Sequence, residues 1–372
     1  QPDGKIVVAG YSYNGSNHDF SLIRLNADGS LDGSFAAGGK LLMPVGSSND
    51  FAYSVTLQPD GKIVVAGDSR NGSDNDFSLI RLNGDGSLDT SFGTGGKQLT
   101  PVGVGNEYGN SVTLQPDGKI VVAGVSSNGS NDDFSLIRLS ANGSLDSSFG
   151  SGGKLLVPVG SSTDQAFSVK LQPDGKIVVA GYSGIGGNEE FSLIRLNADG
   201  SLDGSFGTGG KLLVPVGSSD DFGYSVTLQP DGKIVVAGYS SNGSNWDFSL
   251  IRLNVNGSLD TSFSGDGKLL IPVGSSLDYG YSVTLQPDGK IVVAGEIWIA
   301  GNSTVFGLIR LNADGSLDSS FGTGGKLLMP VGSSNDLAYS VTLQPDGKIV
   351  VAGYSNDSSY NIDFALIRLN PD

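Results

Sequence analysis

A ten-residue segment, QPDGKIVVAG, begins at Gln1 and returns six more times along the chain. The later copies begin at Gln58, Gln115, Gln172, Gln229, Gln286 and Gln344. Five of the six intervals are 57 residues long and the last is 58. A fixed period of this length is typical of arrays in which each unit packs against its neighbours. We therefore expect residues 1–372 to form one domain of six full repeats and a half repeat.

Each repeat contains four short apolar runs, which we label a to d. In the repeat that follows Gly223 they are residues 224–228, 233–238, 248–253 and 268–273. Their length and their Val, Ile, Leu and Phe content predict strands, and no segment has a helical period. Run a alternates apolar and polar residues, whereas b, c and d are apolar at most positions, which indicates strands covered on both faces. A Pro-Asp-Gly turn between a and b predicts a tight hairpin.

Four antiparallel strands per repeat, packed face to face in series, indicate the blades of a β-propeller. A β-solenoid is the alternative, but its rungs are usually shorter and its strands are not joined by such hairpins. The chain supplies seven b and seven c runs but six a and six d runs, which makes 26 strands. Seven four-stranded blades need 28 strands and six need 24, so we expect an all-β, seven-bladed propeller with one blade split or incomplete.

The pattern YSVTLQPDGKIVVAG, followed by FSLIRLNADGSLDxSFG and GGKLL, resembles the delta-60 repeat family and, more distantly, the NHL class of propeller repeat. The resemblance covers the whole chain. It implies a propeller-like fold and a place in large bacterial surface or secreted proteins, and it implies no shared activity. The chain also begins in mid-repeat at Gln1 without an initiator Met, which indicates a segment of a longer precursor.

The formal charge of −16 arises from 38 acidic and 22 basic residues, and most of the basic ones recur in register. Seven Lys follow the PDG turns, seven Arg lie in the c runs and six Lys begin the d runs. The two others, Arg70 and Lys170, form no basic patch, so the acidic field disfavours nucleic acid. The chain has no cysteine for a thiolate metal site and no apolar run of the roughly 18 residues that a membrane span needs.

Three repeated motifs suggest chemistry but are better explained as turns. In NxDGSxD, Asn26, Asp28, Ser30 and Asp32 have the alternating oxygens of a calcium loop, yet the Asp28 position becomes Asn in other repeats while the turn residues persist. We therefore expect no cofactor and no metal, with calcium as the alternative. FGTGGK is not followed by a helix, so it is not a phosphate loop. The NGS tripeptides match glycosylation acceptors but are also favoured tight turns.

Catalytic residues are not evident in this sequence. The one histidine, His18, falls in a Gly/Ser/Asn segment, where we expect a solvated loop residue. The acidic residues repeat from unit to unit, whereas acid–base catalysis needs two groups with different pKa values. A hydrolase in the propeller channel would need a carboxylate that breaks the repeat, and Glu296, in place of the usual Tyr, is the one we identify. We expect the recurring Lys, Arg and Asp to form ion pairs or hydrogen bonds between blades.

The segments between runs b and c vary most, and we expect them to form loops on one face together with the d–a loops. Asp50 and Asp221 are expected on that face too. Its aromatic and histidine residues are the candidate ligand-binding residues: Tyr13, His18, Tyr108, Trp246, Tyr279, Trp298 and Tyr360. Exposed aromatics among Asp and Asn suit a sugar or a protein partner. Drift of unselected loops is the alternative explanation.

These patterns favour a non-enzymatic, extracellular or cell-surface protein with a structural or adhesive role. It would associate with itself or with a neighbouring surface protein, and completion of the incomplete blade between subunits would build fibres. The alternative is a lectin-like or protein-binding propeller that uses the variable face. We expect neither nucleic-acid binding nor membrane insertion in either case.

Overall fold

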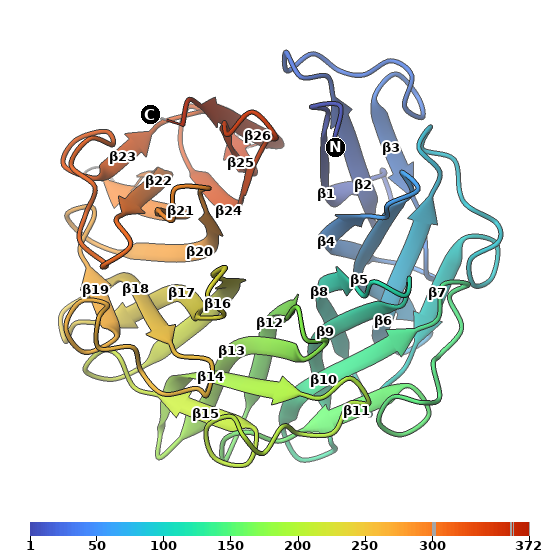
Figure 1. Ribbon diagram of the computed structural model, residues 1–372. Coiled ribbons are helices and arrows are strands. Elements are labelled where there is room, and N and C mark those ends of the chain that lie inside the picture. The colour runs from blue at the N-terminus through green and yellow to red at the C-terminus, as the bar shows by residue number, and fades with distance from the viewer. Residues whose placement is uncertain (300–302, 358, 360, 372) are drawn as a thin grey trace. The chain divides into compact units, whose positions relative to one another are not determined.

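The computed structural model describes residues 1–299, 303–357, 359 and 361–371. All regular secondary structure in this part of the chain is β-strand, and the 26 strands match the predicted number (Figure 1). It contains no helix long and apolar enough to cross a membrane. The chain divides into two compact units, one comprising Gln1–Val179 with Arg195–Asp203 and the other Ala180–Ile194 with Gly204–Asp372. We call them the first and second units.

Each predicted run becomes one type of strand. The a-type strands are β4 (Asp50–Leu57), β8 (Glu107–Leu114), β12 (Asp164–Leu171), β16 (Asp221–Leu228), β20 (Asp278–Leu285) and β24 (Asp336–Leu343). The b-type strands are β1 (Ile6–Tyr13), β5 (Ile63–Asn71), β9 (Ile120–Ser127), β13 (Ile177–Ile185), β17 (Ile234–Ser241), β21 (Ile291–Ile299) and β25 (Ile349–Asn356). The c-type strands are β2 (His18–Leu25), β6 (Asp74–Leu82), β10 (Asp132–Leu139), β14 (Asn188–Leu196), β18 (Trp246–Leu253), β22 (Ser303–Leu311) and β26 (Ile362–Leu369). The d-type strands are β3 (Lys40–Met43), β7 (Lys97–Thr100), β11 (Lys154–Val157), β15 (Lys211–Val214), β19 (Lys268–Ile271) and β23 (Lys326–Met329).

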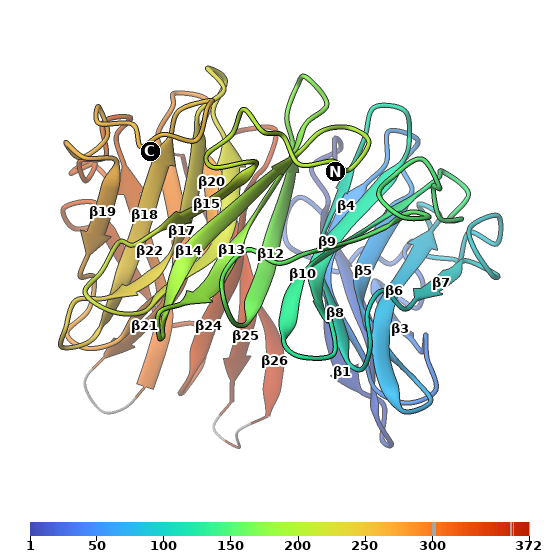
Figure 2. The same ribbon diagram turned by 90° about the horizontal axis from the view of Figure 1, so that it is seen from below.

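The strands pair in chain order into seven antiparallel sheets, the blades. Blade 1 is β1–β3, blades 2 to 6 are β4–β7, β8–β11, β12–β15, β16–β19 and β20–β23, and blade 7 is β24–β26. Blade 1 therefore has three strands and no a-type strand, and blade 7 has three and no d-type strand. The predicted all-β, seven-bladed architecture is confirmed, and the first and last sheets each lack one of the four strands. Because neighbouring strands are antiparallel, b–c and d–a loops lie at one end of a blade and a–b and c–d loops at the other (Figure 2).

The strand lengths differ from the predicted runs for local reasons. The d-type strands have four residues rather than six, since each stops before a proline such as Pro44 or Pro272, which has no N–H for the ladder. The b- and c-type strands are longer than predicted. In blade 5 their pairing continues to Ser241 and Trp246, beyond the apolar runs.

The core consists of side chains from the facing sheets of neighbouring blades. In the first unit, Phe20 and Leu22 of blade 1 pack with Ile63 of blade 2. The consecutive residues Val64 and Val65 point to opposite faces of β5, and both are 0% exposed. The prediction that b-type strands are covered on both faces is therefore confirmed for this blade.

Arginines near the ends of c-type strands link their blades to the next ones. In blade 2, the Arg81 Nε donates to Asp89 Oδ2 at 2.7 Å, and the guanidinium carbon lies 4.7 Å from the centre of the Phe92 ring. The Arg81 Nη1 donates to the backbone carbonyl of Ala141 in blade 3. The same ion pair and inter-blade bond recur at Arg24, Arg138, Arg252 and Arg310.

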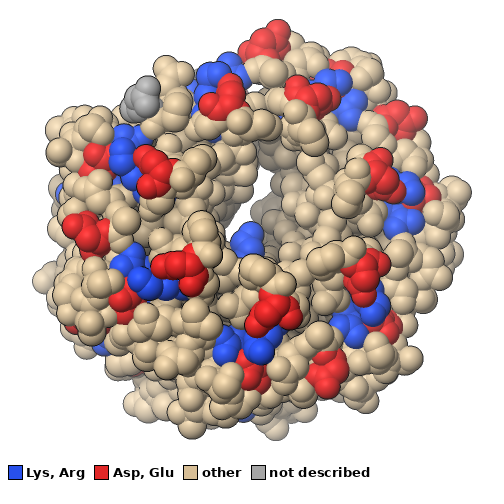
Figure 3. All heavy atoms as spheres, viewed as in Figure 1, with Lys and Arg blue, Asp and Glu red and all other residues tan. Residues whose placement is uncertain are grey.

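The acidic partner in this contact is strongly held in its charged form. Hydrogen bonds from Ser91, together with the charge of Arg81, lower the pKa of Asp89 to about 2 despite burial. Lys62, which follows the PDG turn of the same blade, adds an ion pair to Asp89 at 3.4 Å. The ion pairs of this contact lie within one blade, and the bond from Arg81 to the carbonyl of Ala141 crosses to the next blade. The contact between blades is therefore a hydrogen bond, which is one of the two kinds of contact predicted. In space-filling view, basic and acidic side chains lie side by side on one face (Figure 3).

A glycine in the Asp-Gly turn permits the close approach of neighbouring blades. Gly86 has a φ of +88°, and a Cβ there would lie 2.9 Å from the Phe35 ring and 3.0 Å from the Ala36 nitrogen of the preceding blade. The Ala36 N–H donates to the carbonyl of Asp85 at 2.8 Å, so this backbone contact is itself an inter-blade bond. The turn therefore needs glycine for its conformation and for the space.

We predict that Gly86→Ala lowers the free energy of unfolding by on the order of 2 kcal/mol, because alanine is strained at positive φ and collides with Phe35. Urea unfolding measures this loss. Gly84→Ala is the matched control, since a Cβ there lies 3.7 Å from its nearest atom and other repeats carry Ala27 or Ala141 at this position. An equal loss in both variants would contradict this explanation.

Candidate functional site

Most of the candidate ligand-binding residues lie on strand ends rather than in loops. His18 and Trp246 are the first residues of β2 and β18, Tyr13 is the last residue of β1, and Trp298 lies within β21. The prediction of a solvated loop position for His18 is wrong, because b–c pairing continues to the Tyr13–His18 pair. Four residues, 14–17, close that hairpin, and the Asn14 N–H donates to the Asn17 carbonyl at 2.9 Å.

Tyrosines on the a-type strands are directed by β-bulges. In β16 the register against β17 shifts between Gly223 and Ser225, so the strand pairing skips Tyr224. The same shift makes the strand pairing skip Tyr53, Tyr281 and Tyr339 in β4, β20 and β24. A bulge redirects the side chain of the extra residue. The tyrosine therefore meets the b-type strand of its own blade and the a-type strand of the next.

In the second unit, four aromatic rings lie around the ring of Tyr239 at the b–c end of blade 5. The ring centre of Tyr239 lies 5.0 Å from Phe222 and 5.5 Å from Trp246. It lies 5.4 Å from Tyr224, in stacked geometry, and 4.7 Å from Tyr279 of blade 6. We call Phe222, Tyr224, Tyr239, Trp246 and Tyr279 the aromatic cluster. All five side chains are half-buried, so parts of their rings face solvent.

In the first unit, a smaller group occupies equivalent strand positions. The His18 ring lies 5.6 Å from Tyr11, 5.6 Å from Tyr13 and 5.5 Å from Phe51. His18 has the place in blade 1 that Trp246 has in blade 5. Of the seven candidate residues, the structure thus brings Tyr13 together with His18, and Trp246 together with Tyr279 by way of Tyr239.

The other expected residues have different places. Tyr108 is on β8 and is 37% exposed, Trp298 is half-buried on β21, and Tyr360 lies outside the described residues. Asp50 and Asp221 are 0% exposed, so they are not part of an exposed face. The Asp50 carboxylate accepts the backbone N–H groups of Val45 and Gly46 and so fixes the d–a turn.

Two buried acids replace the tyrosine found at the position of Tyr239 in other blades. Glu296 of blade 6, which the sequence had singled out, lies with its Oε2 3.4 Å from the Tyr281 hydroxyl. Asp68 of blade 2 was missed, although aligning the b-type strands places it in the same column. Its Oδ2 accepts from Asn75 at 2.7 Å, and burial raises its pKa to about 7.

The tyrosine side chains near Tyr239 and Glu296 are poor bases. Burial raises the pKa of Tyr239 and Tyr281 above the ordinary value for tyrosine, and neighbouring tyrosines or carboxylates raise it further. Burial also raises the pKa of Tyr224, which shares a hydroxyl–hydroxyl contact of 3.3 Å with Tyr239. At neutral pH these side chains are hydroxyl donors with apolar faces, which suits binding rather than proton abstraction.

The NxDGSxD loops have the contacts of turns. In the first repeat, Asp28 Oδ1 accepts the backbone N–H and hydroxyl of Ser30. Asp32 Oδ2 contacts two cations, Arg24 at 2.7 Å and Lys5 at 3.0 Å. Because protein donors already occupy these oxygens, the geometry favours the turn interpretation over calcium ligation.

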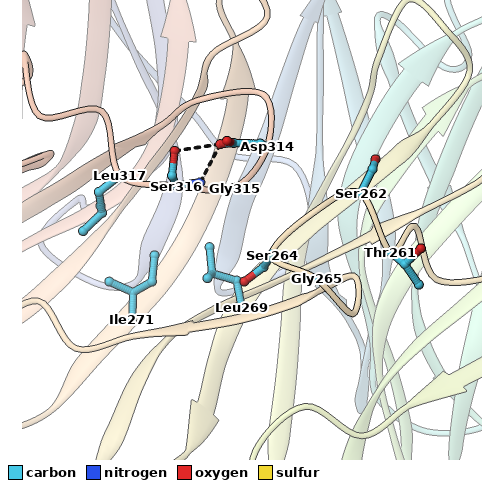
Figure 4. Close-up of a pocket in the computed structure, with 10 residues that line it drawn as sticks. All are labelled: Thr261, Ser262, Ser264, Gly265, Leu269, Ile271, Asp314, Gly315, Ser316 and Leu317. Carbon is cyan, nitrogen blue, oxygen red and sulfur yellow. Dashed lines mark hydrogen bonds between the residues drawn. The ribbon is translucent and has the colours of Figure 1, made fainter.

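A hollow of about 630 Å³ lies at the opposite end of blades 5 and 6, between their c–d loops (Figure 4). It is lined by Ser264, Gly265, Asp314 and Ser316 among others. The Asp314 carboxylate is occupied by the backbone N–H and hydroxyl of Ser316, at 2.9 and 2.7 Å. Besides turn residues, the hollow is lined by Leu269 and Ile271 of β19, and its lining includes no aromatic ring or cation. It is therefore a weaker candidate than the aromatic cluster.

Seven consecutive antiparallel sheets with their core between neighbouring blades define a seven-bladed β-propeller. The chain belongs to the family described as a domain of unknown function (DUF5122) β-propeller. That family matches residues 1–35, 58–92, 115–149, 172–206, 229–263, 286–321 and 344–372, one segment per repeat.

Comparison with solved structures supports the fold alone. A streptogramin B lyase is similar with a TM-score of 0.53 and 14% identity, over 98% of both chains. A polysaccharide lyase of family PL25, an ulvan lyase bound to -[GlcA(1-4)Rha3S]-, is similar with a TM-score of 0.57 and 15% identity, over 100% of this chain and 91% of the lyase. No curated protein matches the sequence significantly.

We predict that Asp68 makes stability fall as pH rises from about 4 to about 7. Its pKa is raised from 3.8 to about 7, so in this range the folded state holds a proton that the unfolded state has lost. Between these pH values, protonated Asp68 accounts for a decrease on the order of 3 kcal/mol in the free energy of unfolding. This decrease should be absent in Asp68→Asn, as measured by urea unfolding at each pH.

Asp60→Asn is the control for this prediction. Asp60 is exposed, and its pKa is lowered because hydrogen bonds from Lys62 outweigh its slight desolvation, so it titrates below this range. The Asp60 variant should keep the wild-type slope. A wild-type slope in Asp68→Asn would show that Asp68 is not the group that titrates.

Proposed function

We propose that this chain is a non-enzymatic, saccharide-binding module of an extracellular or cell-surface adhesive protein. The observation that carries the proposal is the aromatic cluster around Tyr239. Its rings come from four strands of two blades, so they are held by the scaffold rather than by a mobile loop. A rigid group of half-exposed aromatic side chains provides contact area at a small cost in conformational entropy.

The cluster has the two kinds of surface that a sugar ring needs. The faces of Trp246 and Tyr279 are flat and apolar, like the C–H face of a pyranose. The hydroxyl groups of Tyr224 and Tyr239 remain protonated at neutral pH and provide polar contacts for sugar hydroxyls. Stacking with hydrogen bonding at the edges is therefore the expected mode of binding.

Location and architecture support an adhesive role. The resemblance to delta-60 repeats, which occur in large bacterial surface and secreted proteins, favours a place outside the cell. The arginine contact that recurs from Arg24 to Arg310 lets near-identical units be added in series with their blade junctions intact. Lack of an evident general base, in a chain whose one histidine is His18, favours binding over catalysis.

Self-association that completes blades between copies is a second candidate function. The observation that favours it is that β1 and β26 form edges of three-stranded sheets, whereas b- and c-type strands are central in four-stranded blades. Free edges pair readily with another chain. Light scattering over a concentration series tests this proposal, since a mass that stays constant would contradict it.

We predict that Trp246→Asn weakens binding of a neutral hexasaccharide of glucose or N-acetylglucosamine by about tenfold or more, because it removes one stacking face. Asn75 has the equivalent place in blade 2, so the fold should tolerate the change. Isothermal titration calorimetry measures the affinity.

Val255→Ala is the matched control, because Val255 is 51% exposed in the c–d loop and other repeats carry alanine there. It should bind as the wild type does. The proposal would be contradicted if the wild type bound neither the glucose nor the N-acetylglucosamine hexasaccharide. It would also be contradicted if Trp246→Asn and Tyr279→Gln, each of which removes one ring of the aromatic cluster, both bound with unchanged affinity.

A further inference from the structure

Glu296 is a buried acid beside the aromatic cluster, in a place where the repeat otherwise favours tyrosine. Its side chain is 7% exposed, and in the ladder between β20 and β21 it pairs directly with Tyr279. Tyr279 belongs to the cluster, so Glu296 adds a carboxylate to the part of the cluster that lies in blade 6. Where blade 5 presents the Tyr239 hydroxyl, blade 6 presents a carboxylate.

In the part of the chain that the structure describes, this carboxylate has no lysine or arginine as a partner. Among the described residues, the groups that act on Glu296 are the Tyr281 hydroxyl and the indole of Trp298, and no lysine or arginine is among them. Two other buried acids of the second unit differ in this respect. Asp278 lies near enough to Lys326 for its pKa to be affected, and Asp318 pairs with Arg310 at 2.7 Å. Buried carboxylates are normally paired, so Glu296 is an exception that invites an external cation.

Aromatic rings surround the same carboxylate. Trp298 lies two residues along β21, on the same face of the strand as Glu296. Tyr281 lies with its ring centre 6.4 Å from Tyr279 and 5.3 Å from Tyr339, which is 51% exposed. The faces of such rings attract cations, and the attraction is stronger where water is excluded. A carboxylate with several ring faces is the combination that binds an organic ammonium group.

We propose that Glu296, with Tyr279, Tyr281 and Trp298, recognises the ammonium group of an amino sugar. This inference rests on the proposed saccharide-binding function and names the class of sugar. The pyranose stacks on the aromatic cluster, and its ammonium group approaches the Glu296 carboxylate. The net charge of −16 attracts cationic glycans to the protein in general, but only the Glu296 position distinguishes them at the site.

The test compares hexamers of glucosamine with neutral hexamers of N-acetylglucosamine and glucose, by calorimetry at neutral pH. The wild type should bind the glucosamine hexamer about tenfold more tightly than the neutral ones. Glu296→Gln should lose this preference and keep its affinity for neutral hexamers. Glu296→Tyr should do the same, and it is expected to fold because Tyr182 and Tyr239 have this place in other blades.

Asp231→Asn separates the local effect from the general charge. Asp231 is exposed in the PDG turn of blade 5, at the end opposite the aromatic cluster, so loss of its charge should leave the preference for glucosamine unchanged. Equal affinity of the wild type for charged and neutral hexamers overturns the role of Glu296 and leaves saccharide binding intact. A preference that persists in both Glu296 variants overturns it as well. Absence of binding by every hexamer overturns this inference and the proposed function together.

Discussion

The contact between one arginine and the neighbouring blade is the interaction on which the rest of the fold depends. Arg81 is 5% exposed, and its charge is balanced by Asp89 while its flat face covers Phe92. The remaining donor reaches a backbone carbonyl in the next blade, so a buried ion pair also sets the spacing of two sheets. Lysine could not replace it, because it has no planar group that bonds and stacks at once.

That contact leaves the opposite end of each blade free to vary. The Arg81 contact and the Gly86 turn lie among the constant c–d loops, whereas Trp246 and Glu296 lie toward the b–c end. The b–c hairpin pairs in the same way whatever side chains it carries, so His18 and Trp246 occupy the same backbone position although their side chains differ. A fixed junction at one end and a tolerant hairpin at the other allow repeats to differ in function without any change in fold.

The candidate site was predictable only in part. Variation among the b–c segments pointed to His18 and Trp246, because a residue that departs from an otherwise constant repeat is visible by eye. Tyr224 and Tyr239 were missed, since both recur in several repeats and look structural. Asp68 was missed as well, although an alignment of the b-type strands shows that it has the same position in its repeat as Glu296. The bulge that directs Tyr224 has no signal in the hydrophobic pattern.

The sequence by itself determined the number of repeats and the four strands of each, because a regular period and apolar runs buried on both faces permit few other packings. It favoured seven blades, and the pairing of the strands in the structure decided that number. It also determined the glycine turns, whose conformation depends on neighbouring residues. Only the tertiary structure decided that Asp50 is buried at the start of β4, where its carboxylate holds the d–a turn, and that Tyr279 of one blade meets Tyr239 of another. It also decided that Glu296 has no cationic partner among the described residues. Such contacts join residues far apart in the chain, and their geometry depends on how sheets pack rather than on local preference.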